Sequence, residues 1–128
     1  LCATPDPSRA AQPDPCAAPA AHALRAQGAS ISAVLTPEPA PIRVTEPFAL
    51  SIAFCPPQAA AAVERIEVDA SMPMHRHGMN YRASIRRDGI GRYRADGLLL
   101  HMPGLWRFEL VLHAGGVREP LSAELELR

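Results

Sequence analysis

The stretch Trp106-Arg107-Phe108-Glu109-Leu110-Val111-Leu112-His113 decides the fold. Its large apolar side chains stand at every second position, and polar residues fill most of the positions between them. This two-residue period is typical of a β-strand with one buried face. Gly115-Gly116 then predicts a turn, and the same alternation returns from Leu121 to Leu127. The C-terminal part of the chain therefore predicts two neighbouring strands joined by a tight turn.

The same period extends toward the N-terminus in segments 29–35, 42–54, 63–70, 82–86 and 92–95. Turn residues separate these segments: Pro56-Pro57, Asp88-Gly89-Ile90-Gly91, and Pro103-Gly104, which suits a type II turn. The alanine run 59–62 predicts one short helical turn at most. About seven short antiparallel strands with turns between them predict an all-β fold, an immunoglobulin-like β-sandwich.

Residues 1–27 differ from the rest, because they contain five prolines and many alanines but few large apolar side chains. Such a segment gains little from burial, so we expect a flexible tail or linker at 1–27 and a sandwich domain at 28–128. The chain begins with Leu1-Cys2 and not with methionine, and we expect that a leader has been removed. A lipid on Cys2 is the lesser alternative, because leucine directly before the cysteine makes a poor lipoprotein cleavage site.

Composition excludes several classes of function. Thirteen basic and thirteen acidic residues balance, so the chain lacks the positive field that nucleic-acid binding needs. No apolar run is long enough to cross a bilayer. The sequence contains no G-x-S-x-G, P-loop or H-E-x-x-H motif. We therefore expect neither an enzyme nor a transmembrane segment.

The three cysteines have no C-x-x-C spacing. We expect a Cys16–Cys55 disulfide that ties the N-terminal segment to the end of a strand, with Cys2–Cys55 as the competing pair. Either bond would place the protein in an oxidising, extracytoplasmic compartment.

All four methionines and three of the five histidines lie in segments 71–80 and 101–104. Thioether sulfur and imidazole are ligands that copper prefers, so their clustering predicts a copper site. The ligand pool is Met72, Met74, His75, His77, Met79, His101 and Met102. Mixed sulfur and nitrogen ligands favour Cu(I), whereas a site of the three histidines alone would suit Cu(II).

If segment 72–79 is extended, Met72 and Met74 face one side and His75, His77 and Met79 the other. Glu67 and Asp69, just upstream, could orient the imidazoles by hydrogen bonds. The competing interpretation is that Met72 and Met102 only fill the open end of the sandwich.

A second feature is a group of arginines at even positions, expected on the outward face of a hairpin: Arg82, Arg86, Arg92 and Arg94. They could form a basic docking surface for an acidic protein or for lipid headgroups. An ordinary solvated strand face with edge protection is the better explanation of them. The alternative function is thus a metal-free interaction module that docks a partner through its Met/His loops and this basic hairpin.

Segments 72–78 (Met-Pro-x-His-x-His-Gly) and 102–106 (Met-Pro-Gly-x-Trp) frame two further motifs, Asp88-Gly89-x-Gly91-x-Tyr93 and Gly97-Leu98. Together these motifs resemble the FixH-like and YtkA-like periplasmic domains. The resemblance covers roughly residues 29–128 and implies an immunoglobulin-like sandwich with a role in copper handling or cytochrome oxidase assembly, beside a periplasmic or membrane-bound partner protein. This chain departs from that pattern at Met79, where leucine is common, and at His101, where asparagine is common. Both departures add side chains that can bind metal.

Overall fold

The computed structural model describes residues 14–128, and these form an all-β fold with one short 3-10 turn. The strands are β1 (Leu24–Gln27), β2 (Ser32–Glu38), β3 (Phe48–Cys55), β4 (Arg65–Met72), β5 (His77–Gly78), β6 (Ser84–Gly89), β7 (Arg92–Leu98), β8 (Gly104–Ala114) and β9 (Val117–Leu127). The 3-10 turn η1 covers Pro57–Ala60.

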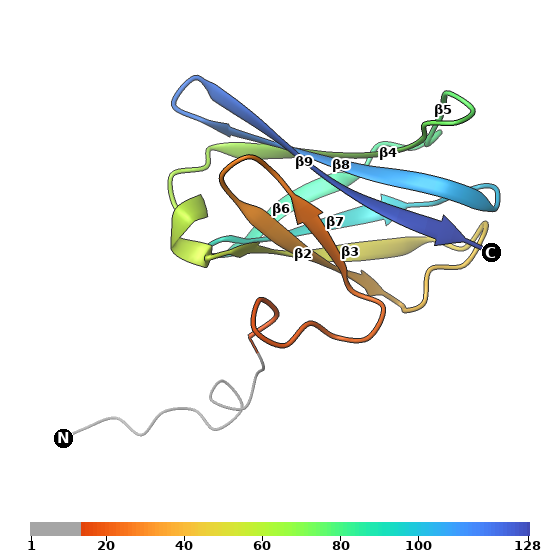
Figure 1. Cartoon of the computed structure of the whole chain (residues 1–128), viewed down its shortest axis with the longest axis horizontal. Coiled ribbons are helices and arrows are strands. Elements are labelled where there is room, and N and C mark those ends of the chain that lie inside the picture. The colour runs from red at the N-terminus through yellow and green to blue at the C-terminus, as the bar shows by residue number, and fades with distance from the viewer. Residues whose placement is uncertain (1–13) are drawn as a thin grey trace.

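The strands hydrogen-bond in the order β5-β4-β8-β9-β1-β2-β3-β7-β6, as one curled sheet whose strand pairs are all antiparallel. Figure 1 shows the two layers that result, with β4, β8 and β9 above and β2, β3, β7 and β6 below. The short strand β1 joins the layers, because it pairs with β2 along its length and meets β9 at Gln27 and Ser122. The fold is thus a sandwich made by folding one sheet over itself.

The core lies between the two layers and is built from the apolar half of each alternating strand. From β8 it takes Trp106, Phe108 and Leu110, all fully buried. Phe108 packs edge-on against Phe48 of the opposite layer, with ring centroids 6.3 Å apart. The described residues bury no charged side chain in this core. The period-two pattern that predicted the strands is therefore the pattern that fills the space between them.

The structure confirms the all-β sandwich and corrects several local details. It has nine strands where we expected about seven. The additional strands are short, and one of them, β1, lies inside the segment expected to be a tail. The helical turn begins at Pro57, two residues before the alanine run. Gly104 opens strand β8 with a φ of +131°, which is not the φ of a type II turn, so the chain passes from β7 to β8 without that tight reversal.

Cys16 and Cys55 form the expected disulfide, which closes a separation of 39 residues and fixes residues near the N-terminal segment to the end of β3. Cys2, the competing partner, lies outside the described residues, as do residues 1–13 of the expected tail. No helix within residues 14–128 is long and apolar enough to span a membrane.

Candidate metal centre

The β4–β5 hairpin carries most of the candidate ligands at its tip. Strand β4 ends at Met72, a four-residue turn follows, and β5 begins at His77. The N–H of His75 donates to the carbonyl of Met72 at 3.1 Å, which closes the turn. Arg76 completes the reversal with a φ of +54°, a left-handed conformation that non-glycine residues rarely adopt. The turn therefore presents His75 and His77 on either side of one strained residue.

The pairing of β4 with β5 differs from the side-chain directions that we expected for segment 72–79. Met72 and His77 are direct cross-strand partners, so their side chains lie on the same face of the hairpin and not on opposite faces. Met72 is 1% exposed and points into the core. His77 is therefore on the inner face of the hairpin, above the end of the core, even though its side chain is exposed.

A second segment, between β7 and β8, brings His101 to the same end of the sandwich. The indole N–H of Trp106 donates to the carbonyl of Met102 at 3.0 Å and thereby fixes this segment over the core. The His101 ring packs edge-on against the Trp106 ring at 5.5 Å. Its other neighbour is His77, 6.3 Å away between ring centroids.

The three imidazoles form a row that runs from solvent to the core. His75 and His77 are 6.4 Å apart, and His101 continues the row to the fully buried Trp106. The Nδ1 atom of His101 is buried and makes no hydrogen bond to any described residue. A buried nitrogen without a partner is costly, so this atom marks a position where a ligand would be favoured.

The four methionines have different surroundings. Met74, in the turn, is 77% exposed, and Met72 lies in the core with its Cε against Gly104. Met102 is partly buried and packs on the core beside His101. Met79 also packs on the core, but it lines a cleft between β4 and β6. The alternative, that methionine only fills space in the core, therefore applies best to Met79 and to the buried side chain of Met72.

Ring spacing limits how the histidines could share an ion. Metal–nitrogen bonds of about 2.0 Å allow two imidazoles on one ion to have centroids up to about 6.4 Å apart, when the ion lies between them in a line. The His77–His101 spacing of 6.3 Å falls within this limit. Within residues 14–128 no group of three His, Cys, Asp or Glu side chains is placed to hold a metal.

Glu67 and Asp69 have other partners, so the expected role of orienting the imidazoles is not what their contacts show. His113 donates to the Glu67 carboxylate at 2.8 Å, and this bond, together with the charge of Arg65, lowers the pKa of Glu67 below its usual range. Asp69 accepts the N–H of Ala70 at 2.8 Å. The His113–Glu67 pair could not be predicted from the sequence, because the two residues are 46 positions apart. The register of β4 with β8 brings them near each other.

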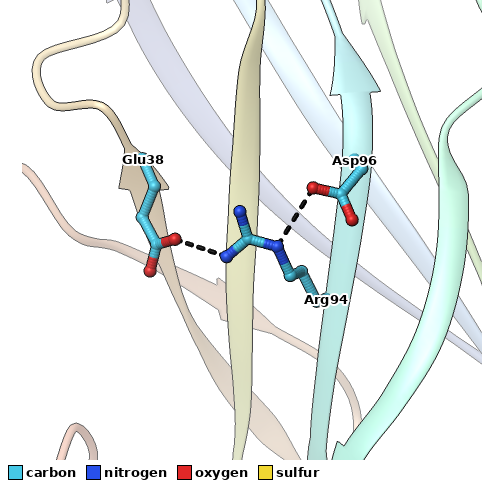
Figure 2. A network of polar contacts seen from close by, with 3 residues as sticks. All are labelled: Glu38, Arg94 and Asp96. Atoms are coloured by element: carbon cyan, nitrogen blue, oxygen red, sulfur yellow. Dashed lines mark hydrogen bonds and ion pairs between the residues drawn. The ribbon is translucent and has the colours of Figure 1, made fainter.

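Arg86 and Arg94 are direct cross-strand partners in β6 and β7, so they lie on one face of that hairpin, whereas Arg82 precedes β6 and lines a cleft beside β4. Figure 2 shows that Arg94 is held between two carboxylates, those of Glu38 and of Asp96, the latter at 3.0 Å. These hydrogen bonds, first that with Glu38, raise the pKa of Arg94 above its usual range. Arg82, Arg86 and Arg92 make no ion pair with any residue between 14 and 128. Of these four arginines, Arg94 is the one paired with carboxylates among residues 14–128.

Comparison with known proteins adds no assignment, because no family model, no curated protein and no solved structure matches this chain.

Proposed function

We propose that this protein binds Cu(I) at the end of its sandwich and serves copper storage, transfer or oxidase assembly in the periplasm. The observation that carries the proposal is the pairing of His77 with His101 above the buried Met72. In this arrangement two imidazole rings are near enough to share one ion, and Met72, the cross-strand partner of His77, carries a thioether on the same face of the hairpin. Cu(I) is soft and accepts few ligands of this mixed type.

The residues divide into an inner seat and an outer set. The inner seat is His77, His101 and Met72, with Met102 beside it. The unpartnered Nδ1 of His101 faces buried surroundings, where an ion would satisfy it. The outer set is Met74 and His75, which are exposed at the tip of the turn. An ion arriving from solvent meets the outer set first, and the row of imidazoles leads it inward.

The preference for Cu(I) over Cu(II) or zinc rests on ligand type and number. Zinc in a structural site takes four nitrogen, sulfur or carboxylate ligands, and its sulfur ligands are thiolates. Three such donors do not converge in the described part of the chain, and Cys16 and Cys55 are consumed by their disulfide. Thioether sulfur, which zinc rarely uses, is what this end of the sandwich offers.

Two further observations support the compartment and the family. The Cys16–Cys55 disulfide fits an oxidising compartment, in which a periplasmic protein would fold. The resemblance to FixH-like and YtkA-like domains remains a prediction. Its Met-Pro and His-Gly elements are the residues that form the hairpin tip, and Trp106 of its last element supports His101.

The test is Cu(I) titration in competition with a chromophoric Cu(I) chelator. The protein with its disulfide intact should take up one equivalent, and the His77→Ala/His101→Ala variant should lose at least about a hundredfold in affinity, since even outer partners of metal ligands contribute 10–100-fold. His22→Ala is the matched control, because His22 is exposed and lies outside the row. Equal affinity of all three proteins would contradict the proposed site.

The second candidate is the metal-free interaction module, and it is favoured by one observation. Arg82, Arg86 and Arg92 carry positive charge on a single region without ion pairs to described residues. If the protein takes up no Cu(I) but binds acidic vesicles or an acidic protein, and loses that binding in Arg86→Ala/Arg92→Ala, this candidate replaces the first. Arg94→Ala is the control, because Arg94 is already neutralised by Glu38 and Asp96.

A further inference from the structure

The two ends of the curled sheet leave a cleft between the layers. One end is β4, which β5 covers only at Ser71 and Met72, and the other end is β6. Figure 1 shows β4 in one layer and β6 in the other. Between them lies a cleft of about 540 Å³, which is lined by both apolar and polar residues. The apolar ones are Ile66, Val68, Met79, Tyr81, Ala83 and Ile85, and the polar ones are Glu67, Asp69, Asn80 and Arg82. The proposed copper site does not use this cleft.

The backbone of β4 faces the cleft with unused hydrogen-bonding groups. The backbone groups of Ala70 point to the edge of β4 that lies opposite β8. Its carbonyl accepts the N–H of Met79 there at 3.1 Å, and its own N–H donates to Asp69 at 2.8 Å. Backbone groups of alternate residues in an antiparallel strand point to the same edge. Those of Val68 and Ile66 therefore point to the edge that Ala70 faces. No strand of the described chain pairs with β4 there.

Two features near the cleft restrict what can lie in it. Arg87 of β6 donates to the carbonyl of Val63, just before β4, and to the hydroxyl of Tyr93 at 2.7 Å. The chain between β5 and β6 lines the cleft from Met79 to Ala83. The floor is apolar and alternates, since Ile66 and Val68 are 6% and 9% exposed. These features suit a short extended chain whose alternate side chains insert between the layers.

We propose that this cleft binds an extended segment of a partner protein, which adds to β4 as a tenth strand and places apolar side chains at alternate positions between the layers. The unused N–H and carbonyl groups of Ile66 and Val68 select a polypeptide backbone, as in other cases of strand addition to a sheet edge. The chain's own first nineteen residues do not suit the role, because prolines at 5, 7, 13, 15 and 19 lack the N–H that a ladder requires. We take a partner protein as the occupant, and a second copy of this chain is the alternative that the experiment distinguishes.

Amide hydrogen exchange on the full-length protein tests the proposal. The probe is a capped synthetic peptide of alternating valine and threonine with a lysine at each end. In the free protein the amides of Ile66 and Val68 should exchange much faster than those of Glu67 and Asp69, which point toward β8. Saturating peptide should slow exchange at Ile66 and Val68 by at least about tenfold. The same peptide with alternate amides N-methylated should have no effect.

A pair of variants separates the cleft from the rest of the surface. Ile85→Glu places a charge in the apolar lining and should abolish peptide binding, whereas Ile90→Glu, at the exposed tip of the next hairpin, should leave it unchanged. The proposal is overturned if exchange at Ile66 and Val68 does not respond to about 1 mM peptide, or if the N-methylated peptide protects them equally. It is also overturned if these amides are already protected in a dimer of the free protein, which would make a second copy the occupant.

Discussion

The methyl end of Met72 rests against Gly104, so close that a β-carbon on Gly104 would lie 2.6 Å from the Met72 Cε. Met72 ends β4 and Gly104 begins β8, which means that the floor of the proposed copper seat is a contact between two strands. Packing of this kind holds the thioether in place before any metal arrives.

Gly104→Ala tests this contact. The residue has a φ of +131°, a region almost confined to glycine, so the substitution should lower the free energy of unfolding by about 1–3 kcal/mol. The new methyl also displaces the end of Met72, and Cu(I) affinity should fall with it. Urea denaturation and chelator competition measure the two effects. Gly78→Ala is the control, since the nearest atom to its added carbon is 3.9 Å away, and it should change neither.

The backbone of Arg76 gives a separate prediction. Its φ of +54° is a conformation that asparagine tolerates better than arginine does and that valine tolerates poorly. Arg76→Asn should raise the free energy of unfolding slightly, and Arg76→Val should lower it by about 1–2 kcal/mol. Both changes remove the same charge, so a difference between them reports the backbone. If the two variants unfold at the same urea concentration, the backbone at Arg76 is not strained and the prediction is wrong.

The disulfide predicts a larger effect. Loss of a cross-link over 39 residues should lower the free energy of unfolding by about 3–4 kcal/mol in the chain-entropy account. Cys16→Ser/Cys55→Ser, compared with the parent by urea denaturation, measures it. The proposed copper site lies at the end of the sandwich where β3 begins, and the disulfide is at the other end of β3, so the folded variant should keep its Cu(I) affinity. A lost affinity in the folded variant would contradict this separation.

Glu67 predicts a dependence of stability on pH. Its hydrogen bond from His113 lowers its pKa in the folded state from the ordinary value of 4.5. A carboxyl of this kind stabilises the fold fully above its unfolded pKa, and the contribution disappears as the pH falls through the folded pKa. The parent should therefore unfold at slightly higher urea than Glu67→Gln at pH 6, and the two should coincide once the carboxyl is protonated. A difference that grows on acidification would have the wrong sign.

The outer ligands predict a kinetic effect. Met74 is 77% exposed and lies outside the seat, so Met74→Ser should slow the transfer of Cu(I) from a chelator without changing the affinity at equilibrium. Stopped-flow absorbance of the chelator complex measures the rate. An equal loss in transfer rate and in affinity would place Met74 in the inner seat. The division into an inner seat and an outer set would then be wrong.

Sequence alone could predict the sandwich because alternation marks long half-buried strands such as β8, where Trp106, Phe108 and Leu110 all enter the core. It could not predict β1 or β5, since four and two residues are too few to show a period. The Cys16–Cys55 bond was predictable because Cys55 ends a recognisable strand.

The candidate site was predictable as a cluster but not in its geometry. The side-chain directions were predicted for an extended segment 72–79, but the chain turns at residues 73–76. This turn places His77 beside Met72 and leaves Met74 exposed to solvent. Met79 follows the hairpin and is carried to the cleft by its bond with Ala70. The partner of Glu67 could not be predicted either, because pairing between strands, which sequence spacing does not reveal, brings Glu67 to His113.

X-ray absorption of the Cu(I)-loaded protein tests the central claim most directly. We expect one copper per chain with two nitrogen neighbours near 2.0 Å and a sulfur neighbour near 2.3 Å, distances typical of imidazole and sulfur ligands. In Met72→Leu, a substitution that conserves volume and should cost less than about 1.5 kcal/mol in stability, the sulfur signal should disappear while the nitrogen signal remains. A spectrum without sulfur in the parent, or a sulfur signal unchanged in Met72→Leu, would contradict a seat made by His77, His101 and Met72.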